Sequence, residues 1–542
     1  MTSQTASLAQ SPTKKLEAKS SLRSEHAFNL LDEKQIGSLR HIGNLARQLT
    51  NDWSGMMGPA HMKEDFGAYR YQLAYMSYAL ALAHYNRLPA APGLFKDTFK
   101  RLVEKMLLPE VWWYWKETSQ GGSPMVPDLP MREGWADPII KENIMYSAYL
   151  QSMALMYNVL FDDDRFAEPG ALTLRYLPTF WNNGVPFEFE YDQNSVNERI
   201  YWNMVESGYL GVACEANCVF QICNQPAIIG FRMHDHLNGG SVAEEVTEGY
   251  VKAWNEFGGM LDEQGHYQTL VVTHRNEVIP GMDTWSDAWL GTLMNSWNPE
   301  FVKEQYTRQR DRWVVRDNHG LMQVRPVEDA QYPEGLLPTS MCDLGWTATW
   351  ASEVGDIETL EGLLAYADAY LSPQYSNGGY FYPRNDNTFD EEGRMVGSHP
   401  SQGNALFPYA RLNVKDGLHN LYTHPWGKEH FAEPALSEVD FSIDLYRAVW
   451  DEEQDTLLFD AALSEAHKGR KGSILISRIF DRGEWVMSRD GQKVAWGGSN
   501  GLSGTVDAGI IHQKGSDLCV EITHLKPAAY VIACSGMNGS LH

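Results

Sequence analysis

The run ENIMYSAYLQSMALM at residues 142–156 repeats its apolar side chains at helical spacing and carries a single charged residue. The run YQLAYMSYALALAH at residues 71–84 has the same character. Because both helices are apolar over most of their circumference, each must be buried on more than one side. This pattern predicts inner helices covered by other helices.

Helical spacing continues over most of residues 26–437, where polar loops containing Gly and Pro separate the apolar runs. Further helix candidates are 28–48, 99–117, 218–237, 241–258, 284–296, 299–310, 345–354, 357–370 and 403–412. A mainly α chain with this many helices and long loops favours an α/α barrel, in which inner helices line a cavity and loops at one mouth carry the chemistry. We therefore expect residues 26–437 to form an α/α-barrel catalytic domain.

After residue 437 the sequence changes to short β-type runs, such as 455–459, 472–477 and 518–523. The turn Arg489-Asp490-Gly491 between two such runs indicates a hairpin. We expect residues 438–542 to form a small antiparallel β domain without catalytic motifs. The first 25 residues are rich in Ser, Thr, Ala and Lys and lack an apolar core, which predicts a disordered tail and no secretory signal.

The composition excludes several classes of partner. The chain has 44 Lys and Arg against 70 Asp and Glu, a formal charge of −26, which disfavours nucleic acid and anionic membrane surfaces. Its 20 Phe, 18 Trp and 26 Tyr suit a large core or an aromatic-lined cavity. No apolar stretch is long enough to span a bilayer, and six cysteines do not form a disulfide framework in a chain of this length. We expect a cytoplasmic protein.

The densest chemical motif is CEANCVFQICN at residues 214–224. Cys214 and Cys223 are nine residues apart and would face opposite ways on one helix. They converge only if Cys214 and Glu215 lie in a loop before the helix, for which Asn217 is a suitable N-cap. The alternative is that these cysteines are small buried apolar residues. The spacing matches no common zinc motif, and no histidine adjacent in sequence provides a base for a cysteine nucleophile.

At this motif the chain resembles the linalool dehydratase/isomerase family, whose α/α barrel interconverts myrcene, linalool and geraniol without metal or organic cofactor. Residues 137–146, DPIIKENIMY, nearly reproduce the family's DPIxKENIMY, and Cys214-Glu215 with Cys223-Asn224 reproduces its CE…CN spacing. The segment at residues 288–299 follows a third family helix. The resemblance extends from about residue 40 to about residue 420 and leaves out the β domain.

The resemblance implies that Cys214, Glu215 and Cys223 surround the reacting alcohol as catalytic residues. It implies that the enzyme uses no cofactor and that its partner is a small hydrophobic isoprenoid substrate. It also implies an acid/base aspartate donated across a subunit interface, so a homo-oligomer is a possible assembly. Asp52 is the candidate for this aspartate. The matching segments also give the substrate-binding candidates, which are Tyr71, Tyr146, Tyr149, Asn224 and Trp285.

Two positions depart from the family. Tyr149 stands where the family has a histidine, and Trp285 stands where it has a tyrosine. A phenol rarely ionises near neutral pH, and an indole only donates but offers a larger aromatic face. The two changes reduce the capacity to relay protons and increase the capacity to stabilise a cation. They predict a substrate larger than a monoterpene alcohol and favour cyclisation of a longer prenyl chain.

The chemistry also follows from the residue types. Dehydration of an allylic alcohol needs an acid for the leaving hydroxyl, stabilisation of a cation and a base for a neighbouring proton. Glu215 and Asp52 are candidate acids, Cys214 and Cys223 are candidate proton relays, and aromatic faces stabilise cations. Two other functions stay open: an α/α-barrel carbohydrate-active enzyme, either a glycosidase or an epimerase, and a binding protein without catalysis.

Overall fold

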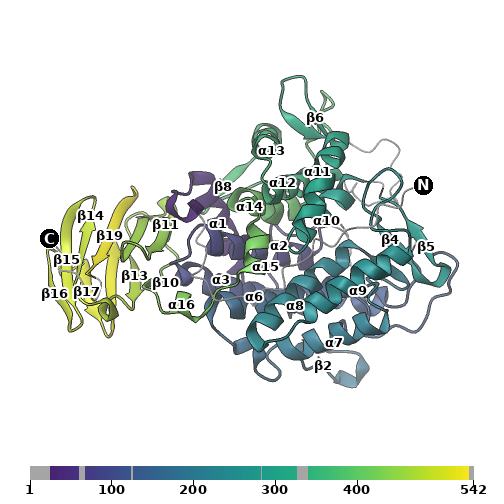
Figure 1. The fold of residues 1–542 in the computed structure, drawn as a ribbon, viewed down its shortest axis with the longest axis horizontal. Coiled ribbons are helices and arrows are strands. Elements are labelled where there is room, and N and C mark those ends of the chain that lie inside the picture. Colours follow the sequence, from purple (N-terminus) through teal and green to yellow (C-terminus); the bar gives the residue numbers. More distant parts are fainter. Residues whose placement is uncertain (1–24, 60–66, 124–125, 282, 326–339, 536–542) are drawn as a thin grey trace.

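The computed structural model describes residues 25–59, 67–123, 126–281, 283–325 and 340–535, so the predicted N-terminal tail lies outside the described residues. Helices dominate from α1 (Glu33–Ala46) to α16 (Lys428–Phe431), with a few short antiparallel strands between them, and the larger antiparallel sheets begin at β10 (Ala435–Val439). Figure 1 shows the sheets gathered at one end of the molecule, beside the helical part. The prediction of a mainly α chain with a separate C-terminal antiparallel β part is confirmed.

The inner helices are α2 (Tyr69–Asn86) and α6 (Ile144–Phe161), in which every residue is buried. This burial accounts for their apolar character on all sides. Besides α1, the other helices of three turns or more are α3 (Pro92–Met106), α7 (Gln193–Glu206), α8 (Gln225–Asn238), α9 (Val242–Glu256), α10 (Thr284–Met294), α11 (Pro299–Trp313), α12 (Ser340–Val354) and α13 (Ile357–Tyr370). Shorter helices are α4 (Pro109–Trp112), α5 (Trp115–Thr118), α14 (Phe407–Leu412) and α15 (Gly417–Thr423).

The predicted helix over 218–237 is wrong in its first seven residues. Residues Cys218–Phe220 form strand β3, which pairs with β4 (Leu270–Val272), and α8 begins only at Gln225. Asn217 is no N-cap, because its φ of 63° closes a tight turn before the strand. Helix α8 instead carries a proline in its first turn, where a missing N–H costs nothing.

The C-terminal strands form a four-stranded sheet in the order β10-β13-β18-β17 and a six-stranded sheet in the order β11-β12-β19-β14-β15-β16. Their bounds are β11 (Ile443–Asp451), β12 (Thr456–Leu463), β13 (Gly472–Ser477), β14 (Trp485–Arg489), β15 (Gln492–Gly498), β16 (Gly501–Thr505), β17 (Ile511–Lys514), β18 (Asp517–Ile522) and β19 (Ala528–Cys534). The predicted hairpin joins β14 to β15, and Asp490 and Gly491 both have positive φ, as a two-residue hairpin turn requires.

Arg40 joins the helical part to the sheets. It lies on α1, is 5% exposed, and pairs with the Asp444 carboxylate on β11. Its guanidinium also donates to the backbone carbonyls of Phe441 and Ile443. Backbone bonds reinforce the junction, because Leu436 N donates to Ala90 O at 2.7 Å. The β part is therefore held by buried polar contacts as well as by apolar packing.

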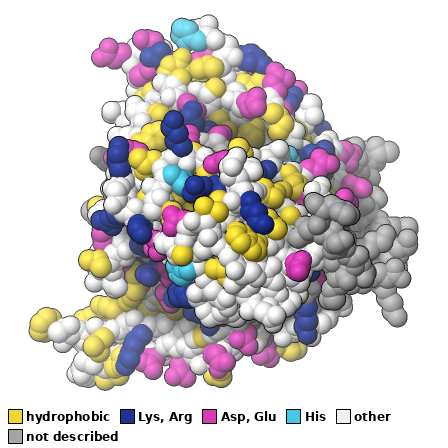
Figure 2. All heavy atoms as spheres, turned by 90° about the vertical axis from the view of Figure 1, so that its left-hand side faces the viewer, with side chains coloured by type: hydrophobic (Ala, Val, Ile, Leu, Met, Phe, Trp, Pro, Cys, Tyr) yellow, Lys and Arg dark blue, Asp and Glu magenta, His cyan; other side chains and the backbone are white. Residues whose placement is uncertain are grey.

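The outer face of the sheet end carries mixed charge. Figure 2 shows Lys and Arg side chains interspersed with Asp and Glu over this face, so no large area of one sign dominates the view. In the described part of the chain, no helix combines the length and apolarity needed to cross a bilayer.

We expect Arg40→Met to lower the free energy of unfolding by about 3 kcal/mol, because it leaves the carboxylate of Asp444 without its buried cation. The matched control is Arg316→Met, which breaks the exposed pair with Glu358 and should cost less than about 1 kcal/mol. Denaturant unfolding of both variants provides the comparison. Equal losses would contradict the role of Arg40 at the junction.

Candidate active site

The turn before β3 brings the Cys-Glu pair toward the start of α8. Cys214 N donates to Cys218 O at 2.9 Å, and Cys218 N donates to Glu215 O at 2.9 Å. Cys223 lies in a short 3₁₀ turn directly before α8, and not down the helix as expected. The prediction that Cys214 and Glu215 lie in a loop before this helix is confirmed.

Asn224 closes this loop on itself. Its side-chain oxygen accepts from Val212 N at 2.8 Å, and its side-chain nitrogen donates to Val212 O at 3.1 Å and Phe220 O at 2.9 Å. Asn224 is fully buried, so these bonds are not exchanged with solvent. The side chain that the sequence indicated as substrate-binding is thus occupied in holding the ends of the loop together.

The DPIIKENIMY segment forms the turn that supports this loop. Glu142 and Asn143 both have positive φ, and the Asn143 side chain accepts from Tyr114 Oη at 2.6 Å and donates to Pro138 O at 3.1 Å. Ile144 N, at the start of α6, donates to Ala213 O, the residue before Cys214. The two matching segments of the sequence therefore build one structural unit.

Cys214, Glu215 and Cys223 form what we call the Cys-Glu cluster. The Cys214 side chain lies beside Cys223 and Glu215, and its interaction with the Cys223 thiol, its burial and the negative charge of Glu215 raise the pKa of Cys214 well above the usual value. Burial also raises the pKa of Cys223. Both residues are therefore thiols at neutral pH rather than thiolates.

Glu215 is half-buried, but its Oε2 atom is shielded from solvent and has no hydrogen-bond partner among the described residues. Desolvation raises the pKa of Glu215, and the nearby Arg70 opposes this effect. A carboxyl group with a raised pKa and a vacant oxygen can hold a proton and give it to a ligand.

Arg70 is a buried cation beside the cluster that the sequence reasoning missed. It is 3% exposed, and its guanidinium carbon lies 4.1 Å from the centre of the Tyr114 ring and 4.6 Å from that of Tyr71. It also donates to Tyr71 Oη at 3.3 Å. The available signal was a single arginine at the start of an otherwise apolar helix.

Five buried rings form what we call the aromatic cluster, and one of them, Tyr71, lies beside the Cys-Glu cluster. Its members come from α2, α6, α10 and α12 and are Tyr71, Tyr75, Tyr149, Trp289 and Trp346. Tyr71 meets Tyr149 edge to face at 6.0 Å and Trp289 at 5.6 Å. Trp289 stacks on Trp346 at 4.2 Å, and Trp346 meets Tyr75 at 4.8 Å. Burial raises the pKa of each tyrosine well above its usual value.

The remaining predicted residues lie at different places. Trp285 borders the aromatic cluster at 6.3 Å from Trp289 and donates to Asp283 Oδ2 at 3.0 Å. The Tyr146 hydroxyl donates to the Met106 carbonyl. Asp52 is at the surface, where the hydroxyl and amide of Ser54 donate to it and lower its pKa.

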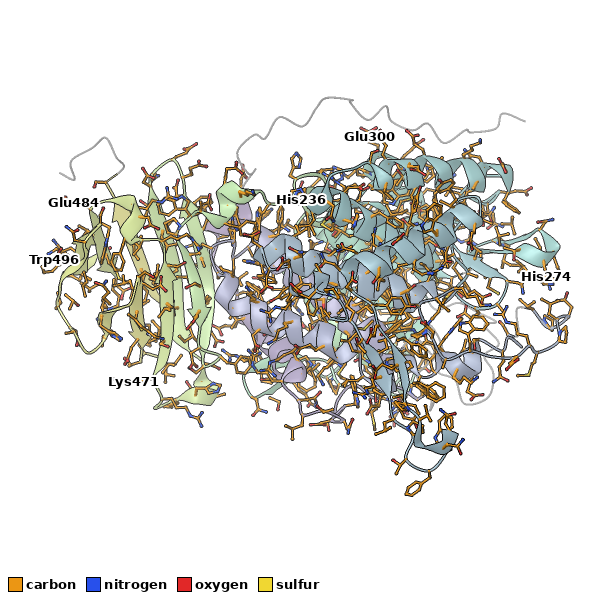
Figure 3. All side chains as sticks on the ribbon, turned by 90° about the horizontal axis from the view of Figure 1, so that it is seen from below. His236, His274, Glu300, Lys471, Glu484 and Trp496 are labelled. Atoms are coloured by element: carbon orange, nitrogen blue, oxygen red, sulfur yellow. The ribbon has the colours of Figure 1, made fainter. Side chains whose placement is uncertain are left out.

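Three histidines make contacts outside the Cys-Glu cluster. Helix α8 carries His236, whose Nε2 pairs with Trp426 O at 2.9 Å, and Figure 3 shows His274 far from it, at the end of the molecule opposite the C-terminal sheets. His266 is buried against Asp287, with 2.5 Å between its Nδ1 and the carboxylate. Among the residues that the structure describes, no three His, Cys, Asp or Glu side chains are grouped to hold a metal ion.

Several solved structures of carbohydrate-active enzymes are similar in outline at very low identity. An inactive variant of an α-1,6-mannanase of Salegentibacter sp. HEL1_6 is 12% identical with a TM-score of 0.40, over 70% of this chain and 99% of that one. A glycoside hydrolase family 76 mannosidase of Bacteroides thetaiotaomicron is 8% identical with a TM-score of 0.37, over 70% and 97% of the two chains. The endoglucanase CelQ of Clostridium thermocellum is 10% identical with a TM-score of 0.35, over 94% and 93%.

A sequence comparison is more specific. The family model described as linalool dehydratase/isomerase matches residues 70–388, more than half of the 542 residues. The matched span begins at Arg70 and contains the 137–146 turn, the Cys-Glu cluster and most of the aromatic cluster's helices. The chain belongs to the linalool dehydratase/isomerase family.

Proposed function

We propose that this protein is a cofactor-free acid/base enzyme that acts on an isoprenoid, either dehydrating and isomerising a prenyl alcohol or cyclising a longer prenyl chain. The observation that carries the proposal is the vacant Oε2 of Glu215, placed where the Cys-Glu cluster meets the aromatic cluster. We include in the proposal that the helices close into an α/α barrel around these residues.

Glu215 is the acid of the proposed reaction. Its proton passes to the hydroxyl oxygen of a prenyl alcohol, the C–O bond breaks, and water leaves an allylic cation. The resulting Glu215 carboxylate then takes a proton from a carbon next to the cation, which gives the olefin and restores the acid. The positive charge of Arg70 stabilises the carboxylate form of Glu215, because it opposes the rise in pKa that desolvation causes.

The thiols position this carboxyl group rather than attack the substrate. Burial keeps both Cys214 and Cys223 protonated, so the Cys214 thiol beside Glu215 acts as a neutral neighbour that helps to orient the carboxyl group. This refines the expectation that the thiols relay protons. A thiolate nucleophile would need a lowered pKa, which is the opposite of the direction found here.

The aromatic cluster stabilises the cation. Each ring face that meets an allylic cation contributes roughly 0.5 to 2 kcal/mol, most where water is excluded. The five rings are at most 8% exposed, which suits an apolar chain. A carbohydrate substrate would need polar partners for its hydroxyl groups along an open groove, so the buried rings favour the isoprenoid over the glycosidase alternative.

Asp52 stays a proposed acid/base group that reaches the site of a second subunit. Its surface position is compatible with donation across an interface, because the groups that hold it are its own neighbours in sequence. Tyr146 and Asn224 are proposed to support the site rather than to bind substrate, because the protein already occupies their polar atoms.

We expect Glu215→Gln to lower kcat at least about 100-fold on a panel of prenyl alcohols, because the amide cannot supply the proton. The melting temperature should change little, since the lost atom has no partner in the fold. Glu215→Asp keeps the acid and should retain part of the activity. For the native enzyme, kcat should fall as the pH rises through the raised pKa of Glu215. Retention of activity within about twofold in Glu215→Gln would contradict the assignment.

We expect turnover to survive EDTA and extensive dialysis, because the proposed steps use only side chains of the chain itself. The measurement is product formation from a prenyl alcohol before and after treatment. Loss of turnover that Mg²⁺ or Zn²⁺ restores would be evidence against the proposal.

We expect the double variant Tyr149→His with Trp285→Tyr to shift preference toward small prenyl alcohols. The imidazole restores a group that titrates near neutral pH, and the smaller ring replaces an indole at the border of the aromatic cluster. The measurement is the ratio of kcat/KM for geraniol to that for a farnesyl-length alcohol. If the native protein already prefers linalool or geraniol, the two departures from the family do not set the size of the substrate.

A further inference from the structure

Helices α10 and α12 lie side by side (Figure 1), and their paired residues show that they run in the same direction. Trp289 stacks on Trp346, Thr292 Oγ1 lies 3.1 Å from Thr349 Oγ1, and Asn295 Nδ2 donates to Glu353 Oε2 at 3.5 Å. Each paired residue of α10 thus faces the residue of α12 that is 57 or 58 positions later in the sequence, over the whole contact. The same register places residue 343 level with residue 286, beside the beginning of α10.

Residue 343 is a buried aspartate whose carboxyl group has no hydrogen-bond partner among the described residues. Asp343 is 1% exposed, and neither carboxyl oxygen has a hydrogen-bond partner among the described residues. The other buried acids of these two helices are satisfied. Glu353 accepts from Tyr409 Oη at 2.6 Å and Asn413 Nδ2 at 2.8 Å, and Asp287 accepts from Trp313 Nε1 at 2.8 Å.

An unpaired buried carboxylate costs several kcal/mol, so such a group holds its proton instead. Desolvation raises the pKa of Asp343 well above its usual value, and the negative charge of Asp283 adds to the effect. Asp283 precedes α10, where its own pKa is raised by burial and its carboxylate accepts from the Trp285 indole. The neutral acid of Asp343 therefore stands beside a second, less buried carboxyl group.

This pair lies at one border of the aromatic cluster. Asp343 is one turn before Trp346 on the same face of α12, and Trp285 is one turn before Trp289 on α10. The Trp346 indole N–H is also buried without a partner among the described residues. Tyr71 borders the cluster on the side of Cys214 and Glu215. The rings are thus flanked by one acid from the Cys-Glu cluster and another from α12.

We propose that Asp343 is a second catalytic acid, which protonates a carbon–carbon double bond of a long isoprenoid at the end opposite Glu215. The inference rests on the proposed function and deepens it, because two acids flanking one row of rings fit a chain longer than a monoterpene. It assigns protonation-initiated cyclisation to the α12 side and dehydration to the Glu215 side.

The step is balanced without an oxidant or cofactor. The O–H bond of Asp343 breaks and a C–H bond forms at the terminal alkene carbon, which leaves a tertiary cation. The next double bond attacks this cation and forms a C–C bond. The final cation loses a proton to Glu215 in its carboxylate form, and Glu215 then releases this proton to solvent. Asp343 regains its proton from solvent through the more exposed Asp283, so the net reaction is an isomerisation.

Turnover in D₂O tests the proposal, because carbon protonation leaves deuterium on carbon whereas dehydration does not. With a farnesyl-length alcohol, the native enzyme should give a cyclised product that carries deuterium at the former alkene end. Asp343→Asn should reduce this product at least about 100-fold and leave dehydration of geraniol within about twofold. The asparagine resembles the neutral acid in shape and charge, so the melting temperature should not fall.

Two further measurements test the protonation state of Asp343 and keep a structural effect apart from a chemical one. The infrared spectrum of the resting protein should lose a protonated-carboxyl band in Asp343→Asn, and persistence of the full band would show that Asp343 does not hold the proton that the proposal needs. Glu353→Gln, a buried acid on the same helix with its partners in place, should lower the melting temperature and leave the fraction of deuterated product unchanged.

The possible failures are distinguishable. If the native enzyme dehydrates geraniol but gives no deuterated cyclic product, or if Asp343→Asn forms that product at the native rate, Asp343 is not a catalytic acid and the proposed function stands. If the native enzyme turns over neither alcohol, the proposed function is overturned together with the inference.

Discussion

The three hydrogen bonds of the Asn224 side chain are the constraint on which the site depends. They tie Val212 and Phe220 to the residue that precedes α8, so the intervening loop must fold back on itself. Only this return brings Cys214 and Glu215 to Cys223. A buried amide that makes all its bonds to backbone is costly to replace, because each broken bond leaves a buried polar group unpaired. The loop is therefore rigid enough to hold a carboxyl group in one direction.

Desolvation gives this rigid loop its chemistry. Burial raises the pKa of Glu215 against the opposing charge of Arg70, and it leaves Oε2 without a hydrogen-bond partner among the described residues. The same burial keeps the thiols protonated. A fold in which the Glu215 carboxyl group made hydrogen bonds within the protein would be more stable, as the hydrogen-bonded carboxylate of Glu353 illustrates. The unpaired oxygens are better explained as groups that meet a ligand.

Sequence patterns predicted the elements and the loop chemistry but not the contacts across helices. Residues 142–156 and 71–84 indicated inner helices because their apolar character is local, and the CE…CN spacing indicated a return before α8. The start of that helix was misplaced because a tight turn at Asn217 leaves almost no periodic signal. Arg70 and Asp343 were missed for another reason. Their significance arises from neighbours more than 40 residues away in sequence, as in the register between α10 and α12.

The most direct test of the account is a crystal structure of the Glu215→Gln protein with a farnesyl-length alcohol bound. The account predicts the hydroxyl oxygen within about 2.6–3.2 Å of the residue 215 side chain, with the prenyl chain along the aromatic cluster toward α12. A chain bound instead in the apolar hollow between α1, α3 and β11, which is lined by Ile36, Leu94 and Phe441, would contradict it.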